Sequence, residues 1–265
     1  MTSRIAAAFE RARGENRLAL ITLVIPGYPG DETEAVFDAM VEGGADLVEI
    51  EIPFSDPLAD GTTIQRAAFA ALENGTTPAD CLDFARRARQ RHPETPIVFM
   101  TYLNPVLAYG LDRFAAEAAD LGADGIILLD LPAEESAREK RAFGSRGLDL
   151  IFLVAPTSSD ERVQRICAEA GGFVYCVSVA GVTGARTELP PDLKGFVERV
   201  RRCTSLPLAV GFGISRREHV ESLAGVADGV VVGSAFMDVI ASSKPGERAK
   251  AVREYVEVLS GRRRP

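Results

Sequence analysis

Acidic side chains with the pattern of a general acid–base pair lie in and after one apolar segment of the chain. Glu49 and Glu51 alternate with Val48 and Ile50, so both carboxyl groups share one face of a predicted strand. Asp60 follows in a loop rich in Pro and Gly, which could place a second carboxylate opposite Glu49. Burial of an ionised Glu is costly unless it is paired, protonated or functional. We expect Glu49 to be a general acid/base. The structural alternatives are a salt bridge at the rim for Glu49 and a turn or helix cap for Asp60.

Glycine-rich turns that suit a phosphate group follow three later apolar segments, at 180–184, 211–215 and 233–235. Glycine lets backbone N–H groups approach an anion, and a helix N-terminus adds a favourable dipole. Each turn by itself is most often only a turn. Together they predict a phosphorylated substrate.

Other chemistries lack their residues. His92 and His219 fall in a predicted helix or at its end, which argues against a His-based triad or a His-rich metal site. The four lysines also fall in predicted helices or at their edges, so no Schiff-base lysine is expected on a strand. The four cysteines show no metal-binding spacing, which is typical of reduced thiols in a cytosolic protein.

These side chains need a scaffold of alternating strands and helices. A weak repeat, Gly-Ala-Asp at 44–46 and 122–124 and Val-Ala-Asp at 226–228, precedes three of the strands. Helices are expected to begin near Pro78, Pro132, Ser159 and Ser215, and one more helix over 5–13 would cap the barrel bottom. The predicted strands are 19–25, 47–52, 97–102, 125–129, 149–154, 173–177, 207–211 and 229–233.

Eight apolar strands alternating with helices favour a closed (β/α)8 TIM barrel as one domain over residues 1–265. An open doubly wound sheet is the alternative, but no GxGxxG motif follows the first strand. In such barrels the chemistry lies where strands end and the following loops begin. Glu49, Asp60 and the glycine-rich turns all fall at such places.

Composition limits the partners and the cellular location that we expect for the protein. The 265 residues carry a formal net charge of −8, which argues against nucleic acid as a partner. No segment is apolar for long enough to cross a membrane, and the apolar stretch at 5–9 is too short for a signal peptide. We expect a cytoplasmic protein.

The segment Pro53-Phe54-Ser55-Asp56-Pro57-Leu58-Ala59-Asp60-Gly61, together with 180–184 and 211–215, resembles the tryptophan synthase alpha chain family. The match extends through Tyr102, Asn104-Pro105 and 233–235 and covers nearly the whole chain in order. The resemblance implies a (β/α)8 lyase that cleaves indole-3-glycerol phosphate into indole and glyceraldehyde 3-phosphate by a retro-aldol reaction. It implies no cofactor in this chain. The expected partner is a beta chain that uses pyridoxal phosphate, in an αββα complex.

The resemblance also assigns roles to individual residues. Glu49 matches the general acid/base, Asp60 the carboxylate that stabilises the charged indolenine, and Tyr175 the active-site tyrosine. The expected substrate contacts are Ile64, Tyr102, Thr183 and Phe212; the expected phosphate contacts are Gly184, Gly213, Gly233 and Ser234; and the expected partner-facing loop is Pro53, Phe54, Ser55, Asp56 and Pro57. No metal ligand is implied.

The sequence departs from the family pattern where Glu51 stands in place of a usual Gly and Thr62 in place of a usual Pro. Three outcomes stay open for Glu51: it fills pocket space, it perturbs Glu49, or it turns to solvent at the barrel mouth. Three functions stay open: an ordinary alpha chain, a stand-alone or specialised lyase that releases free indole, and a non-catalytic activator of a beta chain. Intact Glu49 and Asp60 weigh against the activator, and the intact loop favours the ordinary alpha chain.

Overall fold

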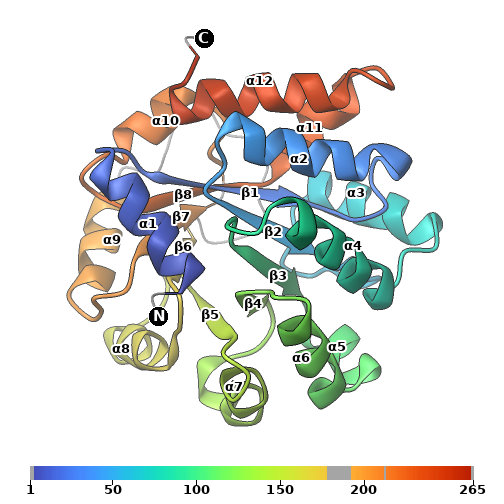
Figure 1. Ribbon diagram of the computed structural model, residues 1–265. Helices are drawn as coiled ribbons and strands as arrows, with labels where there is room; N and C mark the ends of the chain where they lie inside the picture. The colour runs from blue at the N-terminus through green and yellow to red at the C-terminus, as the bar shows by residue number, and fades with distance from the viewer. Residues whose placement is uncertain (1–2, 178–191, 212, 264–265) are drawn as a thin grey trace.

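Eight parallel strands close into a barrel in chain order, with β1 pairing both β2 and β8 (Figure 1). The computed structural model describes residues 3–177, 192–211 and 213–263. The closed barrel is confirmed over the open sheet, and every strand lies within one residue of its expected ends. The strands are β1 Ala19–Val24, β2 Leu47–Glu51, β3 Ile97–Thr101, β4 Gly125–Leu128, β5 Asp149–Val154, β6 Val174–Val177, β7 Leu208–Gly211 and β8 Gly229–Val232.

Helices surround the barrel and close their own ring, because α12 packs along α2 (Figure 1). They are α1 Arg4–Gly14, η1 Gly30–Glu32, α2 Thr33–Gly43, α3 Thr62–Glu73, α4 Pro78–Arg91, α5 Leu103–Tyr109, α6 Leu111–Asp120, η2 Ala133–Glu135, α7 Ala137–Gly144, α8 Asp160–Glu169, α9 Leu193–Arg201, α10 Arg217–Ser222, α11 Ser234–Ser242 and α12 Arg248–Ser260. Over the described ranges, none of these helices has the length and apolar character needed to cross a membrane.

Local capping explains where several helices begin. Thr77 and Asp80 form a capping box at the start of α4, and the Ser159 side chain caps α8. Pro132 precedes the short 3₁₀ turn η2, and α7 begins only after it. The expected start near Ser215 is wrong, because α10 begins at Arg217. The backbone N–H of Ser215 instead donates to Nδ1 of His219, at 3.3 Å.

Strand register decides which side chains enter the barrel. Glu49 pairs with Leu23 of β1 and Val98 of β3, and Glu51 pairs with Met100 of β3. Leu23, Glu49 and Met100 all line the pocket at the barrel mouth, so this set of positions faces inward. Since side chains alternate along a strand, Glu51 belongs to the same inward set.

The repeated aspartates lock strand pairs together at the opposite, N-terminal end of the barrel. The backbone N–H of Asp46 donates to the carbonyl of Leu20 at 2.8 Å, and the Asp46 carboxylate accepts from the Leu20 N–H at 2.9 Å. Asp124 makes the same two bonds with Ile97, and Asp228 makes them with Leu208. We call this reciprocal pair of bonds the aspartate clamp. It ties β1 to β2, β3 to β4 and β7 to β8.

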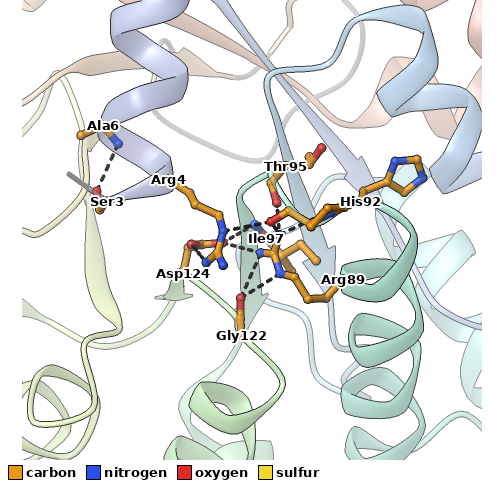
Figure 2. A network of polar contacts seen from close by, with 10 residues as sticks. Ser3, Arg4, Ala6, Arg89, His92, Thr95, Ile97, Gly122 and Asp124 are labelled. Carbon is orange, nitrogen blue, oxygen red and sulfur yellow. Dashed lines mark hydrogen bonds and ion pairs between the residues drawn. The ribbon is translucent and has the colours of Figure 1, made fainter. Parts of the chain in front are cut away.

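Arginines neutralise each clamp, and helix α1 supplies one to each. Arg4 of α1 and Arg89 of α4 both pair with Asp124, at 3.0 and 2.7 Å (Figure 2). Arg11 and Arg13, also on α1, pair with the other two aspartates of the clamp, Asp46 and Asp228. Arg17 and Arg201 complete those two sites. The expected helix at the barrel bottom is confirmed, with Ile5, Phe9 and Ala12 buried beneath it.

We predict that Asp124→Asn destabilises the fold, because the amide can still accept from Ile97 but leaves Arg89 without a carboxylate. The Arg89 and Asp124 side chains are 12% and 6% exposed, and breaking such a pair costs about 3 kcal/mol. Asp83→Asn is the control, since Asp83 and Arg86 form a solvent-exposed pair for which we expect about 0.5 kcal/mol or less. Urea unfolding followed by circular dichroism measures both. Equal losses would contradict the role of the clamp.

Candidate active site

A pocket opens at the C-terminal end of the barrel strands, where the sequence placed the chemistry. It holds about 620 Å³ of empty space, counting the open solvent at its mouth. Glu49 from β2, Asp60 and Gly61 from the following loop, and Tyr175 from β6 contribute to its wall. The remaining lining residues are Leu23, Ile64, Met100, Leu129, Leu153, Gly213, Ile214, Val231, Gly233 and Ser234.

Glu49 is a buried acid in the pocket and has no cationic partner in the part of the chain that the structure describes. Its side chain is 1% exposed, and its Oε1 atom has no hydrogen-bond partner among the described residues. Burial raises the pKa of Glu49 to about 8, because an ionised carboxylate loses its hydration there. Glu49 is therefore protonated at neutral pH and able to give a proton. The salt bridge at the rim, its structural alternative, is not formed within the described ranges.

Asp60 is held by a tyrosine that the sequence assigned to the substrate. Tyr102 donates its hydroxyl to Oδ2 of Asp60 at 2.8 Å and accepts from the N–H of Ala59 at 2.9 Å. Burial raises the pKa of Asp60 to about 6, and the bond from Tyr102 works against that rise. Asp60 is thus ionised at neutral pH while Glu49 is not. Tyr102 lies behind Asp60 and not among the pocket-lining residues.

Tyr175 of β6 lies inside the barrel, directly against Gly211 of the neighbouring strand β7. A Cβ atom at Gly211 would stand 2.3 Å from the Tyr175 hydroxyl oxygen, so only glycine leaves room for the ring. Burial raises the pKa of Tyr175 well above its ordinary value, and the charges of Glu49 and Asp60 add to that rise. The tyrosine therefore keeps its proton beside both carboxyl groups.

Three of the expected phosphate contacts, Gly213, Gly233 and Ser234, line the pocket. Gly213 has φ of +82°, a conformation that glycine adopts without strain. Ser234 begins α11, so the N-terminal end of that helix opens onto the pocket and its backbone N–H groups suit an anion. Three further expected contacts, Thr183, Gly184 and Phe212, lie outside the described residues.

Glu51 is buried, so the alternative that it turns to solvent is wrong. It is 2% exposed, and it does not line the pocket. Burial raises its pKa well above the ordinary value, with the negative charges of Asp60 and Glu49 adding to the effect.

The expected partner-facing loop has a buried base and an exposed tip. Pro53 and Pro57 are buried, and Phe54 packs against Tyr102 with ring centroids 5.3 Å apart. Ser55 and Asp56 are exposed and bonded to each other at 2.6 Å. Leu58, beside them, is 88% exposed.

Sequence reasoning missed the apolar wall of the pocket. Met100, Leu129 and Leu153 come from β3 and from the ends of β4 and β5, on the side of the barrel away from β7 and β8. They provide an apolar surface for a flat ring. Their signal was available in the sequence, because each takes an inward position near the C-terminal end of a predicted strand. Within the described ranges, no cluster of three or more His, Cys, Asp or Glu side chains is arranged to hold a metal ion.

Comparison with known proteins identifies the family of this chain. The family model described as tryptophan synthase alpha chain matches residues 9–262. A tryptophan synthase alpha chain from Roseiflexus castenholzii is 51% identical, covering 98% of this chain and all of the relative. Among solved structures, tryptophan synthase subunit alpha from Legionella pneumophila superposes with a TM-score of 0.90 at 36% identity. A Mycobacterium tuberculosis tryptophan synthase structure gives 0.90 at 37% identity, and both alignments cover 98% of each chain. This chain belongs to the tryptophan synthase alpha chain family.

Proposed function

We propose that this chain is a lyase that cleaves indole-3-glycerol phosphate into indole and glyceraldehyde 3-phosphate, with Glu49 and Asp60 as its working carboxyl groups. The observation that carries the proposal is that one pocket is lined both by Glu49, which is 1% exposed and has an oxygen without a partner among the described residues, and by Asp60, which accepts a hydrogen bond from Tyr102. Burial raises the pKa of Glu49 to about 8 and that of Asp60 to about 6. Two carboxyl groups whose pKa values are pushed apart supply the acid and the anion that a retro-aldol cleavage needs.

The pocket has a polar part and an apolar part, and these two parts orient such a substrate. The phosphate lies at Gly213, Gly233 and the N-terminal end of α11, and the indole ring lies against Met100 and Leu153. The glycerol chain then spans the space between them, which brings its hydroxyl groups and indole C3 toward Glu49.

The steps of the reaction follow from a protonated Glu49 and an ionised Asp60. Glu49 gives its proton to indole C3, which places a positive charge on the ring nitrogen, and the Asp60 carboxylate stabilises that charge. Glu49 then accepts the proton of the adjacent glycerol hydroxyl as the carbon–carbon bond breaks. The bonding electrons return to the ring, an aldehyde forms, and Glu49 is again protonated. Tyr102 holds Asp60 in place, and Tyr175 lines the ring.

We also propose a beta chain as partner, in an αββα complex, with pyridoxal phosphate bound by that partner. The exposed Leu58 and the exposed pair Ser55 and Asp56 support the loop as its contact. The chemistry proposed for this chain needs only its own side chains. The four cysteines are free thiols, which supports the cytoplasm as the location. We retain the single (β/α)8 domain over 1–265 as part of the proposal.

We predict that Glu49→Gln lowers the rate of cleavage by about 10²- to 10⁴-fold, because the amide keeps the shape of the side chain but cannot transfer the proton. Binding of glycerol phosphate should change little, which separates lost chemistry from lost fold. The assay follows indole release with and without a beta chain. A rate that rises with the beta chain supports the partner, and near-native turnover by the variant would rule out Glu49 as the acid.

The pH dependence of kcat/KM should be bell-shaped. Activity falls below a pH of about 6, where Asp60 takes up a proton and loses its charge. It falls again above a pH of about 8, where Glu49 ionises and has no proton to give. Steady-state assays from pH 5 to 10, about one unit below the acidic limb and about two units above the alkaline limb, measure the profile. A profile that keeps rising above pH 9 would contradict a protonated Glu49.

Substitution of Gly213 tests the phosphate site. Asp and Asn both tolerate positive φ, and a Cβ atom at Gly213 meets nothing within 4 Å. Gly213→Asp should weaken binding of glycerol phosphate more than tenfold, which is about 1.4 kcal/mol, because its carboxylate repels the phosphate. Gly213→Asn is the neutral control and should bind within a few fold of the native chain. Calorimetry measures both, and equal affinities would refute the assignment.

A further inference from the structure

Glu51 is a buried carboxyl group for which the cleavage mechanism above has no role. It lies two positions after Glu49 on β2 and is 2% exposed. Its Oε2 atom has no hydrogen-bond partner within the described ranges. Glu51 is not among the residues that line the pocket, and the charged groups that act on it are Asp60 and Glu49.

The ionisable groups that face Glu51 are acids. They are Glu49 on β2, Asp60 in the following loop, Tyr102 after β3 and Cys81 on α4, each of which interacts electrostatically with Glu51. Strand β1, on the other side of β2, carries no ionisable side chain between Ala19 and Val24.

The charged side chains of the neighbouring helices α2 and α3 do not pair with Glu51: Glu42 pairs with Arg253, and Glu73 is exposed at the end of α3. Glu34 and Asp38 of α2 pair with arginines of α4 at the surface. Arg66 of α3 is 65% exposed and pairs with Asp238. No arginine, lysine or histidine of the described ranges forms an ion pair with Glu49, Glu51 or Asp60.

Three buried carboxyl groups that have no cationic partner among the described residues cannot all be ionised. Each carboxylate loses hydration on burial, and a second charge nearby adds repulsion that water screens poorly at this depth. Asp60 holds the charge best, because it is the least buried of the three and accepts the hydroxyl of Tyr102. The charge therefore stays on Asp60.

We propose that Glu51 is a positioning residue of the cleavage reaction: an uncharged carboxylic acid that stands behind Asp60 and Glu49, leaves the negative charge of the cluster on Asp60, and solvates that charge as a polar neighbour. The inference rests on the proposed function. An ionised Glu51 would repel both working groups and raise both of their pKa values. An apolar side chain would strip polar surroundings from Asp60 and raise its pKa alone.

A matched pair of variants separates these states. Glu51→Gln keeps the size and polarity without the ability to ionise, and Glu51→Met keeps the size without the polar group. We expect E51Q to leave both limbs of the kcat/KM profile within about 0.3 pH units of the native positions. We expect E51M to move the acidic limb up by about one pH unit and to leave the alkaline limb in place.

Two results would overturn the proposal. If E51Q moves both limbs to lower pH, Glu51 is ionised in the native chain and its charge was raising both pKa values. If E51M and E51Q give the same profile, Glu51 only fills space. Circular dichroism spectra and unfolding midpoints of both variants show whether each is folded, so a profile is compared only between folded proteins.

An infrared measurement tests the protonation of Glu51 without relying on turnover. The carbonyl stretch of protonated carboxyl groups at pH 7 should lose intensity in E51Q relative to the native chain, and E49Q provides the comparison band. An unchanged band in E51Q would mean that Glu51 is ionised. If the native chain does not cleave indole-3-glycerol phosphate, the proposed function fails, whereas this band still reports on Glu51.

Discussion

The aspartate clamps at the N-terminal end of the barrel fix the register of the strands above them. Each clamp uses both the N–H and the carbonyl of one strand residue, so the partner strand cannot slide by one position without losing both bonds. A slip of one residue would turn every side chain of a strand to its other face. For β2 this would send Glu49 out toward the helices and leave the pocket without its acid. The chemistry at one end therefore depends on hydrogen bonds at the other.

The two ends of the barrel treat buried carboxyl groups in opposite ways. At the N-terminal end each aspartate pairs with two arginines, and its charge is compensated in place. At the C-terminal end Glu49, Glu51 and Asp60 form no ion pair within the described ranges, so their pKa values rise. The paired carboxylates hold strands together, whereas a fully buried carboxyl group without an ion pair, such as Glu49, keeps its proton at neutral pH. The same residue types thus give stability at one end and reactivity at the other.

Local patterns in the sequence were enough to predict the barrel and the place of Glu49. Runs of apolar residues identified the strands, alternation within one of them placed Glu49 and Glu51 on a common face, and the repeat before three of the strands identified the turns that form the aspartate clamps. Contacts between distant segments were not predictable in this way. The hydrogen bond from Tyr102 to Asp60 joins the residue after β3 to the loop after β2, and the local sequence around either residue does not predict it. The sequence equally did not predict whether the Glu51 side chain is buried or exposed, and the folded structure shows that it is buried. The helix expected to begin near Ser215 begins two residues later, at Arg217, and the Ser215 N–H donates to His219.

Tyr175 and Gly211 constrain each other's evolution. Any side chain at Gly211 collides with the tyrosine ring, so a larger residue is tolerated there only after the ring has become smaller. That first step removes the aromatic wall beside Glu49 and Asp60. The order of the two changes is therefore fixed, and the intermediate is a damaged enzyme. Among descendants of this chain, the two positions should covary, with glycine retained at one for as long as tyrosine is retained at the other.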